Sequence, residues 1–458
     1  MRLPRRLSRA RLSKERRAGS SLGPGGEWAE SSNDASPIAG PGANTNEVGP
    51  MHASPEAEPV LEIANLSIIY RGFAGDVKAV SNVNLALRAA EVVGLAGESG
   101  SGKSTLAYGA CRLLRPPALI TSGSVTYRGR RAREPVEVLR ESPEGLRRLR
   151  WREIAIVFQS AMNALNPVLS VRDQLLDAVT AHLHLAKAEA LEKVASLSDL
   201  VGIDRSRLRS YPHELSGGQR QRVMIAMALA ADPEVVIMDE PTTALDVVVQ
   251  RDILAQVVEL QERLRFSIIF ITHDLSLLLE FADRIAVMYA GRLVETGTSN
   301  EIYHNASHPY TNGLLSSFPA LHGPRRRLTG IRGWPPDLRS LPPGCPFLPR
   351  CDLGTPSCEG VDMHLARVSP SSSTHFSACP FVRAEGPGWR KGGAELKPPP
   401  TQNTGATSRG VQVPRGPGDQ PSAGPLEAIG IGPGGTGSGG GSHDDTGFPA
   451  PDYPAAGS

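Results

Sequence analysis

The hydrophobic positions of this chain fall into two patterns that predict strands. Apolar and polar residues alternate over 61–70 and 79–87, as they do in strands that are buried on one face. Uninterrupted apolar runs predict fully buried strands at 92–96, 154–158, 235–239 and 268–271. A further strand is predicted at 123–127. Because the alternating strands precede the first buried strand, we expect a small antiparallel sheet beside a core sheet.

Two other segments predict helices. Residues 104–114 follow a glycine-rich loop and read as one helix. Between 170 and about 210, apolar residues such as Val171, Leu175 and Val179 recur at helical spacing. We interpret this apolar stripe as packing, without a further role.

Both ends of the chain lack such patterns. Residues 1–58 begin with an arginine-rich run and continue into a segment rich in Gly, Pro, Ser and Asn, which cannot bury a core. We interpret the run as a solvated tail or as a start codon placed too far upstream. Its composition also resembles an organelle transit peptide or a contact with anionic lipid. Residues 385–458 are rich in Gly, Pro, Ser and Thr and are predicted to be disordered.

The overall composition indicates which kinds of molecule this chain could bind directly. The 458 residues carry a formal net charge of +2, which argues against a polyelectrolyte role on nucleic acid. No apolar run approaches the ~18 residues that a membrane span needs. We therefore expect no nucleic-acid partner, and any role at a membrane should come through another chain.

The clearest chemical motif follows the first buried strand. It consists of Gly97, Glu98, Ser99, Gly100, Ser101, Gly102, Lys103, Ser104 and Thr105. Glycines let backbone N–H groups approach phosphate oxygens, and a helix N-terminus adds a positive dipole end. Lys103 is predicted to reach the β- and γ-phosphates, and the Ser104 hydroxyl to take one Mg²⁺ position. The strand before the loop and the helix after it argue against an ordinary Gly/Ser-rich surface loop.

Polar side chains stand at the ends of three other predicted strands. Asp239 matches the carboxylate that holds Mg²⁺ in P-loop sites, and Glu240 is placed to polarise an attacking water as a general base. Gln159 can hold Mg²⁺ or water near a γ-phosphate, although a single Gln is weak support. His273 stands where loops meet phosphates in such sheets, and a lone His there is more often structural.

A second pair of glycines begins a predicted helix. The motif is Leu215 followed by Ser216, Gly217, Gly218 and Gln219, a second arrangement suited to an anion. With the P-loop and the strand-end residues in this order, the region from 60 to about 300 resembles the nucleotide-binding domain of an ATP-binding-cassette (ABC) transporter. This second motif distinguishes that family from kinases and GTPases.

The resemblance implies an α/β P-loop NTPase fold for residues 59–300. It consists of a RecA-like core, an antiparallel β subdomain and a helical signature subdomain at about 168–222. ATP and Mg²⁺ are the implied cofactors, and Ser104, Gln159 and Asp239 the implied Mg²⁺ ligands. No motif is degenerate, so the resemblance implies a site competent for hydrolysis.

The family resemblance also assigns roles to single residues. It implies that Glu240 activates water, that His273 holds the γ-phosphate and that Tyr70 stacks on adenine. Tyr70 also reads as an ordinary edge aromatic, and the sequence leaves both readings open.

The resemblance further implies partner chains. In this family the signature motif, here Ser216 to Gln219, faces the nucleotide of a second cassette arranged head to tail. We therefore expect a second nucleotide-binding domain, either a copy or a paralogue. Two transmembrane permease subunits are expected to dock near the loop after Gln159, with an extracytoplasmic solute-binding protein acting indirectly. The implied location is peripheral, at the cytoplasmic face of the cell membrane.

Residues 301–384 narrow the family further. His308 to Thr311 and the segment from Gly344 to Cys351 resemble the C-terminal extension of the di- and oligopeptide importer ATPases, nearer the D-type than the F-type subunit. This small extension contains Cys345, Cys351, Cys358 and Cys379.

Four thiolates of this spacing could hold Zn²⁺ or a [4Fe–4S] cluster, because disulfides are disfavoured in a reducing cytosol. The resemblance favours the [4Fe–4S] cluster, with zinc and free cysteines as alternatives. We expect such a site to staple the extension rather than to catalyse, and we do not expect His375 to be a ligand.

The combined expectation is an ATP-hydrolysing subunit that powers import of di- or oligopeptides. One alternative is the same cassette importing nickel, glutathione or another small solute. Another is a soluble ABC ATPase for translation or repair. Such proteins usually carry two cassettes or a long coiled-coil insert, and this chain has neither.

Overall fold

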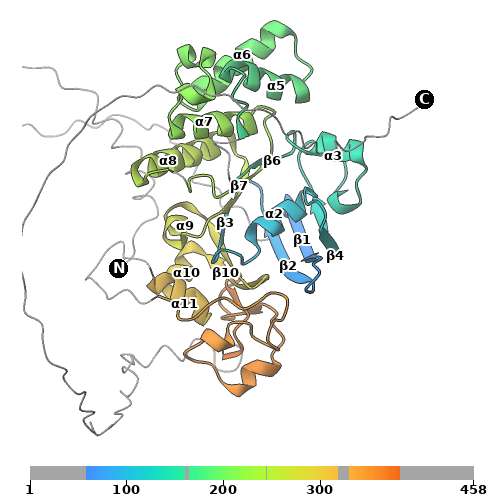
Figure 1. Cartoon of the computed structure of the whole chain (residues 1–458), viewed down its shortest axis with the longest axis vertical. Coiled ribbons are helices and arrows are strands. Elements are labelled where there is room, and N and C mark those ends of the chain that lie inside the picture. The colour runs from blue at the N-terminus through green and yellow to red at the C-terminus, as the bar shows by residue number, and fades with distance from the viewer. Residues whose placement is uncertain (1–57, 160–163, 244, 318–329, 382–458) are drawn as a thin grey trace, which may run out of the picture. The chain divides into compact units, whose positions relative to one another are not determined.

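The computed structural model describes residues 58–159, 164–243, 245–317 and 330–381 (Figure 1). The predicted tails lie outside these ranges apart from residue 58, as do Ala244 and part of the loop after Gln159. The described residues form two sheets and a set of helices around them.

The smaller sheet is antiparallel, as the alternating pattern predicts. It contains β1 (Leu61–Tyr70), β2 (Val77–Leu87), β4 (Ala118–Tyr127) and β5 (Val136–Glu137), in the order β2-β1-β4-β5. Alternate residues of β1 and β2 are buried in one hydrophobic cluster. The strand predicted at 123–127 is the second half of β4.

The larger sheet has eight strands, in the order β11-β12-β10-β9-β3-β8-β7-β6. They are β3 (Val92–Ala96), β6 (Ile154–Val157), β7 (Val235–Asp239), β8 (Ser267–Ile271), β9 (Arg284–Tyr289), β10 (Arg292–Thr298), β11 (Ala366–Arg367) and β12 (Phe376–Ser377). Strands β6, β7, β8, β3 and β9 run parallel, whereas β10, β12 and β11 are antiparallel. Every residue of β3, β6, β7 and β8 is buried, as a parallel sheet covered on both faces requires.

Three helices form a separate layer at the top of Figure 1. They are α5 (Val171–His182), α6 (Lys187–Leu200) and α7 (Gly217–Ala228), and they pack on one another. The helical region predicted at 170–210 is thus two helices and a 3₁₀ turn (Arg205–Arg209). Leu183 adopts an extended conformation and ends α5.

The helix after the glycine-rich loop is shorter than predicted. Helix α2 spans Lys103–Ala110, not 104–114. Arg112 has a φ of 54°, and a left-handed residue of this kind ends a helix. Periodicity alone could not locate this end, because Leu113 and Leu114 still fit the apolar pattern.

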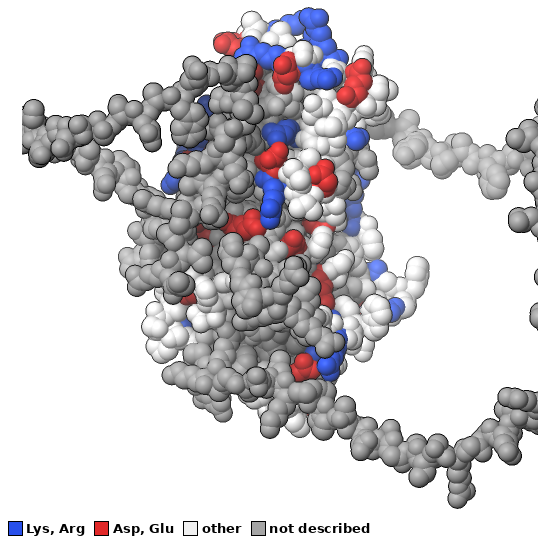
Figure 2. All heavy atoms as spheres, turned by 90° about the vertical axis from the view of Figure 1, so that its left-hand side faces the viewer, with Lys and Arg blue, Asp and Glu red and all other residues white. Residues whose placement is uncertain are grey.

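The remaining helices cover the sheet and its edges. They are α3 (Pro143–Leu149), α8 (Val247–Leu264), α9 (Leu275–Phe281), α10 (Ser299–Asn305), α11 (Pro309–Ser316) and four further 3₁₀ turns (Val138–Arg140, Pro212–Glu214, Leu348–Arg350 and Pro356–Gly360). None of the helices in the described ranges combines the length and the apolar character needed to cross a bilayer. On the face in Figure 2, basic and acidic side chains are interspersed where described residues are visible.

The part of the C-terminal extension after residue 330, orange in Figure 1, joins the larger sheet through β12. Ser377 and Phe376 of β12 are register partners of Glu295 and Thr296 of β10. The buried Glu295 carboxylate accepts the His308 N–H at 2.9 Å and lies 2.8 Å from His375 Nε2. His375 therefore serves to attach the extension to the sheet.

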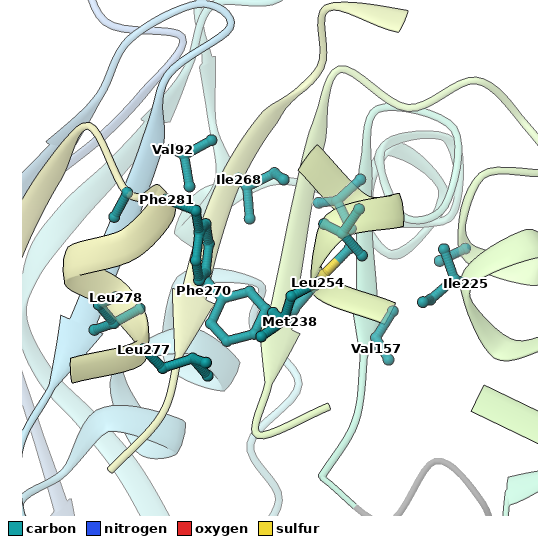
Figure 3. Packing of buried hydrophobic residues seen from close by; sticks show 14 of the residues in the cluster. Val92, Val157, Ile225, Met238, Leu254, Ile268, Phe270, Leu277, Leu278 and Phe281 are labelled. Atoms are coloured by element: carbon teal, nitrogen blue, oxygen red, sulfur yellow. The ribbon is translucent and has the colours of Figure 1, made fainter. Parts of the chain in front are cut away.

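The main core lies between the larger sheet and helices α7, α8 and α9 (Figure 3). Phe270 of β8 is completely buried, and its ring meets that of Phe281 of α9 edge-on, with centroids 5.0 Å apart. Met238 of β7 and Leu254 of α8 belong to the same cluster. This packing holds the strands whose ends carry the polar residues described below.

We predict that Phe270→Ala lowers the free energy of unfolding by ~3–5 kcal/mol, because it removes a buried ring and leaves a cavity. Denaturant titration followed by circular dichroism measures this change. Val168→Ala is the control, since Val168 is exposed and its truncation should change stability by less than ~0.5 kcal/mol. Equal effects of the two substitutions would contradict the assignment of Phe270 to the core.

Candidate nucleotide-binding site

The glycine-rich loop connects β3 to α2, as predicted. Gly102 is the N-terminal cap of α2 and has a φ of 101°, in the left-handed region. A Cβ atom at this position would overlap the carbonyl oxygen of Ala79 in β2. The residue must therefore be glycine for both its backbone conformation and its close approach to the neighbouring strand.

Lys103 is held inside the loop. Its side chain is buried, and Nζ donates to the carbonyl oxygens of Gly97 at 2.8 Å and Glu98 at 2.9 Å. Burial lowers the pKa of Lys103, and the carboxylates of Glu240 and Asp239 partly offset that effect. The loop thus contains a cation enclosed by backbone groups, which suits a phosphate ligand.

Asp239 lies against the first turns of α2. Its Oδ1 accepts the Ser104 hydroxyl at 3.0 Å, and its Oδ2 accepts the Tyr108 hydroxyl at 2.7 Å. Burial raises the pKa of Asp239, whereas the two hydrogen bonds lower it. Tyr108 was not predicted, although its spacing of four from Ser104 places both residues on one helix face.

The Glu240 carboxylate contacts polar side chains that follow the ends of β6, β7 and β8. Its carboxylate accepts Gln159 Nε2 at 2.9 Å, lies 3.4 Å from His273 Nδ1, and accepts the Thr243 hydroxyl at 3.0 Å. Glu240 itself has a φ of 42°, a strained conformation for a residue with a side chain. Thr243 was not predicted. Its signal in the sequence is a hydroxyl in the turn directly after the strand.

The three residues expected to bind Mg²⁺ do not all contact one another. Gln159 contacts Glu240, while the other two expected Mg²⁺ ligands, Ser104 and Asp239, bond to each other. Tyr70 ends β1, and its hydroxyl lies 3.2 Å from Thr105 Oγ1 of α2. This position is beside the phosphate loop, and stacking of Tyr70 on adenine stays a prediction.

The signature motif lies in another part of the molecule. Ser216 caps α7, where its Oγ accepts the Gln219 N–H at 3.3 Å and Gln219 Oε1 accepts the Ser216 N–H at 3.0 Å. In Figure 1, α7 lies with α5 and α6, away from α2. Within the described ranges, no hydrogen bond or ion pair joins 216–219 to 97–105. Ser216 is exposed, so this helix start is accessible to another molecule.

The residues beside the phosphate loop fit Mg²⁺. This ion is usually held by one or two carboxylates together with phosphate oxygens and water. The Asp239 carboxylate and the Ser104 hydroxyl supply two suitable oxygens 3.0 Å apart. A triphosphate on the loop would supply the others.

The four late cysteines are free thiols within one region of the extension. The Cys345 N–H donates to the Cys358 carbonyl oxygen at 3.0 Å. Burial raises the pKa of Cys351 and of Cys379 to about 11, and each thiol is close enough to Cys345 and Cys358 to be affected by their charge. However, the described residues include no group of three or more His, Cys, Asp or Glu placed to hold a metal. The expected [4Fe–4S] cluster therefore has no support in this arrangement.

Two known protein families match parts of this chain. The family model described as ABC transporter matches residues 80–243, and the one described as oligopeptide/dipeptide transporter, C-terminal region, matches 294–358.

Two similar proteins each match about two thirds of this chain. The dipeptide transport ATP-binding protein DppD of Bacillus subtilis is 43% identical over 307 residues, which are 66% of this chain and 90% of that protein. A protein of Brucella ovis that is named as a peptide import ATP-binding protein is 42% identical over 331 residues, which are 70% of this chain and 97% of that protein. A solved structure from Clostridium perfringens, part of the ABC transporter complex cbiONQ, has a TM-score of 0.47 and 28% identity over 54% of this chain and 92% of that one.

We predict that Gly102→Ala abolishes nucleotide binding and lowers the melting temperature, because the new Cβ would displace either β2 or the loop. Gly75→Ala is the matched control. Gly75 lies outside the phosphate loop and also has a positive φ, but a Cβ there meets nothing within 4 Å, so only ~1 kcal/mol of backbone strain is expected. Fluorescence titration with a nucleotide analogue and thermal unfolding measure both effects. Equal losses in the two variants would show that close packing of Gly102 is not the cause.

Proposed function

This chain belongs to the ABC transporter family of ATP-binding subunits, and we propose that it hydrolyses ATP to power import of dipeptides or oligopeptides. Relatives 42% and 43% identical, each covered over at least nine tenths of its length, establish the family. Their names, and the match of 294–358 to the oligopeptide/dipeptide transporter region, support peptides as the cargo. We propose the division into a cassette at 59–300 and an extension at 301–384 on the same basis.

The observation that carries the hydrolytic function is the set of contacts around Glu240. Its carboxylate is held by Gln159, Thr243 and His273 at the edge of the sheet where the phosphate loop also lies. In our proposal, one carboxylate oxygen accepts the proton of a water that attacks the γ-phosphorus, and the bond from that phosphorus to the β,γ-bridging oxygen breaks to release ADP. Gln159 and His273 orient that water and the γ-phosphate.

The phosphate loop performs the binding. Its backbone N–H groups and Lys103 hold the triphosphate, and Ser104 and Asp239 would hold Mg²⁺. When bound, Mg²⁺ neutralises charge on the β- and γ-phosphate oxygens. Tyr108 keeps the Asp239 carboxylate in place through its hydrogen bond to Oδ2.

We further propose that two cassettes act as a pair. Ser216 is exposed at the start of α7, and Figure 1 shows α7 apart from α2, which follows the phosphate loop; this supports contact with a nucleotide on a second cassette. Val247 and Val248 at the start of α8 are also exposed, which suits an interface. Binding of two ATP molecules between the cassettes would hold them closed, and hydrolysis would let them separate.

The membrane partners are proposed to dock at the loop after β6. Phe158 and Val168 flank this loop and are 37% and 75% exposed, respectively, although both are large and apolar. Such residues favour contact with another chain. We propose two permease subunits there, with a solute-binding protein acting through them. We therefore propose that the chain is a peripheral subunit at the cytoplasmic face of the membrane.

We predict that Glu240→Gln lowers ATP turnover by roughly 10²–10⁴-fold, because the amide cannot take the proton, while ATP binding persists. Phosphate release and nucleotide titration measure the two effects, and peptide uptake by cells should fall with turnover. Glu259→Gln, an exposed carboxylate on α8, is the matched control and should behave as wild type.

The same Glu240→Gln chain tests the pairing. With ATP it should elute with its second cassette as a stable pair, and adding Ser216→Arg should prevent this. Unchanged turnover in Glu240→Gln would exclude Glu240 as the base, and pairing that tolerates Ser216→Arg would exclude the signature contact.

As a separate proposal, we propose a metal cofactor on the four late cysteines, because all four lie in the extension and a backbone hydrogen bond of 3.0 Å joins Cys345 to Cys358. A [4Fe–4S] cluster is the first candidate and Zn²⁺ the second. Since the described residues include no group of three or more side chains placed to hold a metal, either cofactor would require a rearrangement of the thiols.

We predict that the full chain, purified without oxygen, contains iron and sulfide, and that Cys345→Ser and Cys379→Ser remove them. Elemental analysis and visible absorption measure the content. Cys111→Ser is the control, since this buried cysteine lies in a hydrophobic cluster that contains none of the four late cysteines. Zinc instead of iron would identify the second candidate, and absence of both metals would show that the cysteines are free.

A further inference from the structure

The acidic residue of the phosphate loop, Glu98, is bound by an arginine 252 positions further along the chain. Arg350 donates to both carboxylate oxygens of Glu98, at 2.7 Å and 2.9 Å. This two-point geometry is the strongest form of an arginine–carboxylate pair. The pair joins the C-terminal extension directly to the loop that binds phosphate.

Arg350 is held rigidly for this contact. Its side chain is only 5% exposed, and its Nε donates to the Arg332 carbonyl oxygen at 2.8 Å. The guanidinium carbon lies 5.8 Å from the ring centroid of Tyr289 and 5.9 Å from that of Phe347. An arginine fixed on so many sides loses little freedom when it binds a carboxylate.

A second bond reaches the same loop residue. The backbone N–H of Glu98 donates to the Tyr310 hydroxyl of α11 at 2.8 Å. The Tyr310 ring packs against Tyr289 and Phe347, with centroids 4.5 Å and 5.4 Å away. Residues after 300 therefore hold both the side chain and the backbone of Glu98.

The charge of Glu98 has consequences for the ligand. A carboxylate in the phosphate loop opposes a triphosphate, and it attracts Lys103, which already donates to the Glu98 carbonyl oxygen. Neutralisation by Arg350 removes both effects. The partial burial of the pair makes this neutralisation stronger than at an open surface.

We propose that Arg350 is a positioning residue of the nucleotide site. It neutralises Glu98 and turns its carboxylate away from the phosphates, so that the loop amides and Lys103 are free for ATP. The proposal rests on the ATP-binding function above. It makes the C-terminal extension a determinant of nucleotide affinity, in addition to any role in the stability of the fold.

A purely structural role for Arg350 gives a different expectation. If Arg350 only clips the extension onto the cassette, removing the Glu98 charge cannot repair its loss. If Arg350 acts through that charge, Glu98→Gln should restore nucleotide binding to an Arg350 variant. The double variant therefore separates the two roles.

The experiment titrates trinitrophenyl-ATP with Mg²⁺ into the full chain. We expect Arg350→Ala to raise Kd roughly tenfold, and Arg350→Ala with Glu98→Gln to return to within about threefold of Glu98→Gln alone. In steady-state hydrolysis, Arg350→Ala should raise KM for ATP with little change in kcat. Arg339→Ala is the matched control, because Arg339 pairs with exposed Asp337 in the same extension. It should leave Kd unchanged.

Two results would overturn the proposal. One is an unchanged Kd in Arg350→Ala, and the other is a double variant as weak as Arg350→Ala. Should Arg350→Ala fail to fold by circular dichroism, Arg350→Gln replaces it, with the same expectations. Failure of the ATP-binding function looks different, since the unaltered chain would then bind no probe and Lys103→Ala would change nothing.

Discussion

The site depends on one constraint of topology: neighbouring parallel strands end at the same edge of a sheet. Strands β3, β8, β7 and β6 lie side by side in that order, and each is followed at this edge by a polar group. Ser104 and Asp239 thereby meet across 135 positions of sequence. Hydrophobic residues pack on both faces of these strands and hold the strand ends in fixed positions.

Charged groups at this edge are partly or wholly buried, and the structure compensates each of them. Lys103 is held by two carbonyl oxygens, Asp239 by two hydroxyls and Glu98 by a guanidinium. A buried charge without partners would cost several kcal/mol. The same partners also fix the side chains in place. The hydrogen bonds that offset the cost of burial therefore also determine the geometry of the site.

The sequence was sufficient for features that local pattern encodes. The two sheets and the strand–loop–helix unit follow from apolar runs that end in polar residues. Contacts that depend on side-chain direction or on distant segments were not accessible. Tyr108 looked like any helix residue, and nothing local connects Arg350 with Glu98. The cysteines show the opposite limit, because four cysteines in one segment of the sequence do not form a converged set of metal ligands among the described residues.

The antiparallel strands β10, β12 and β11 form the edge of the larger sheet opposite β6, and the short length of β12 and β11 matters for association with other chains. Strand β12 covers β10, and both β12 and its neighbour β11 are only two residues long. Short outer strands of this kind deny a template to foreign chains. Truncation before residue 366 would uncover the backbone of β10 and invite self-association. The extension therefore cannot be treated as a detachable module in engineering the cassette.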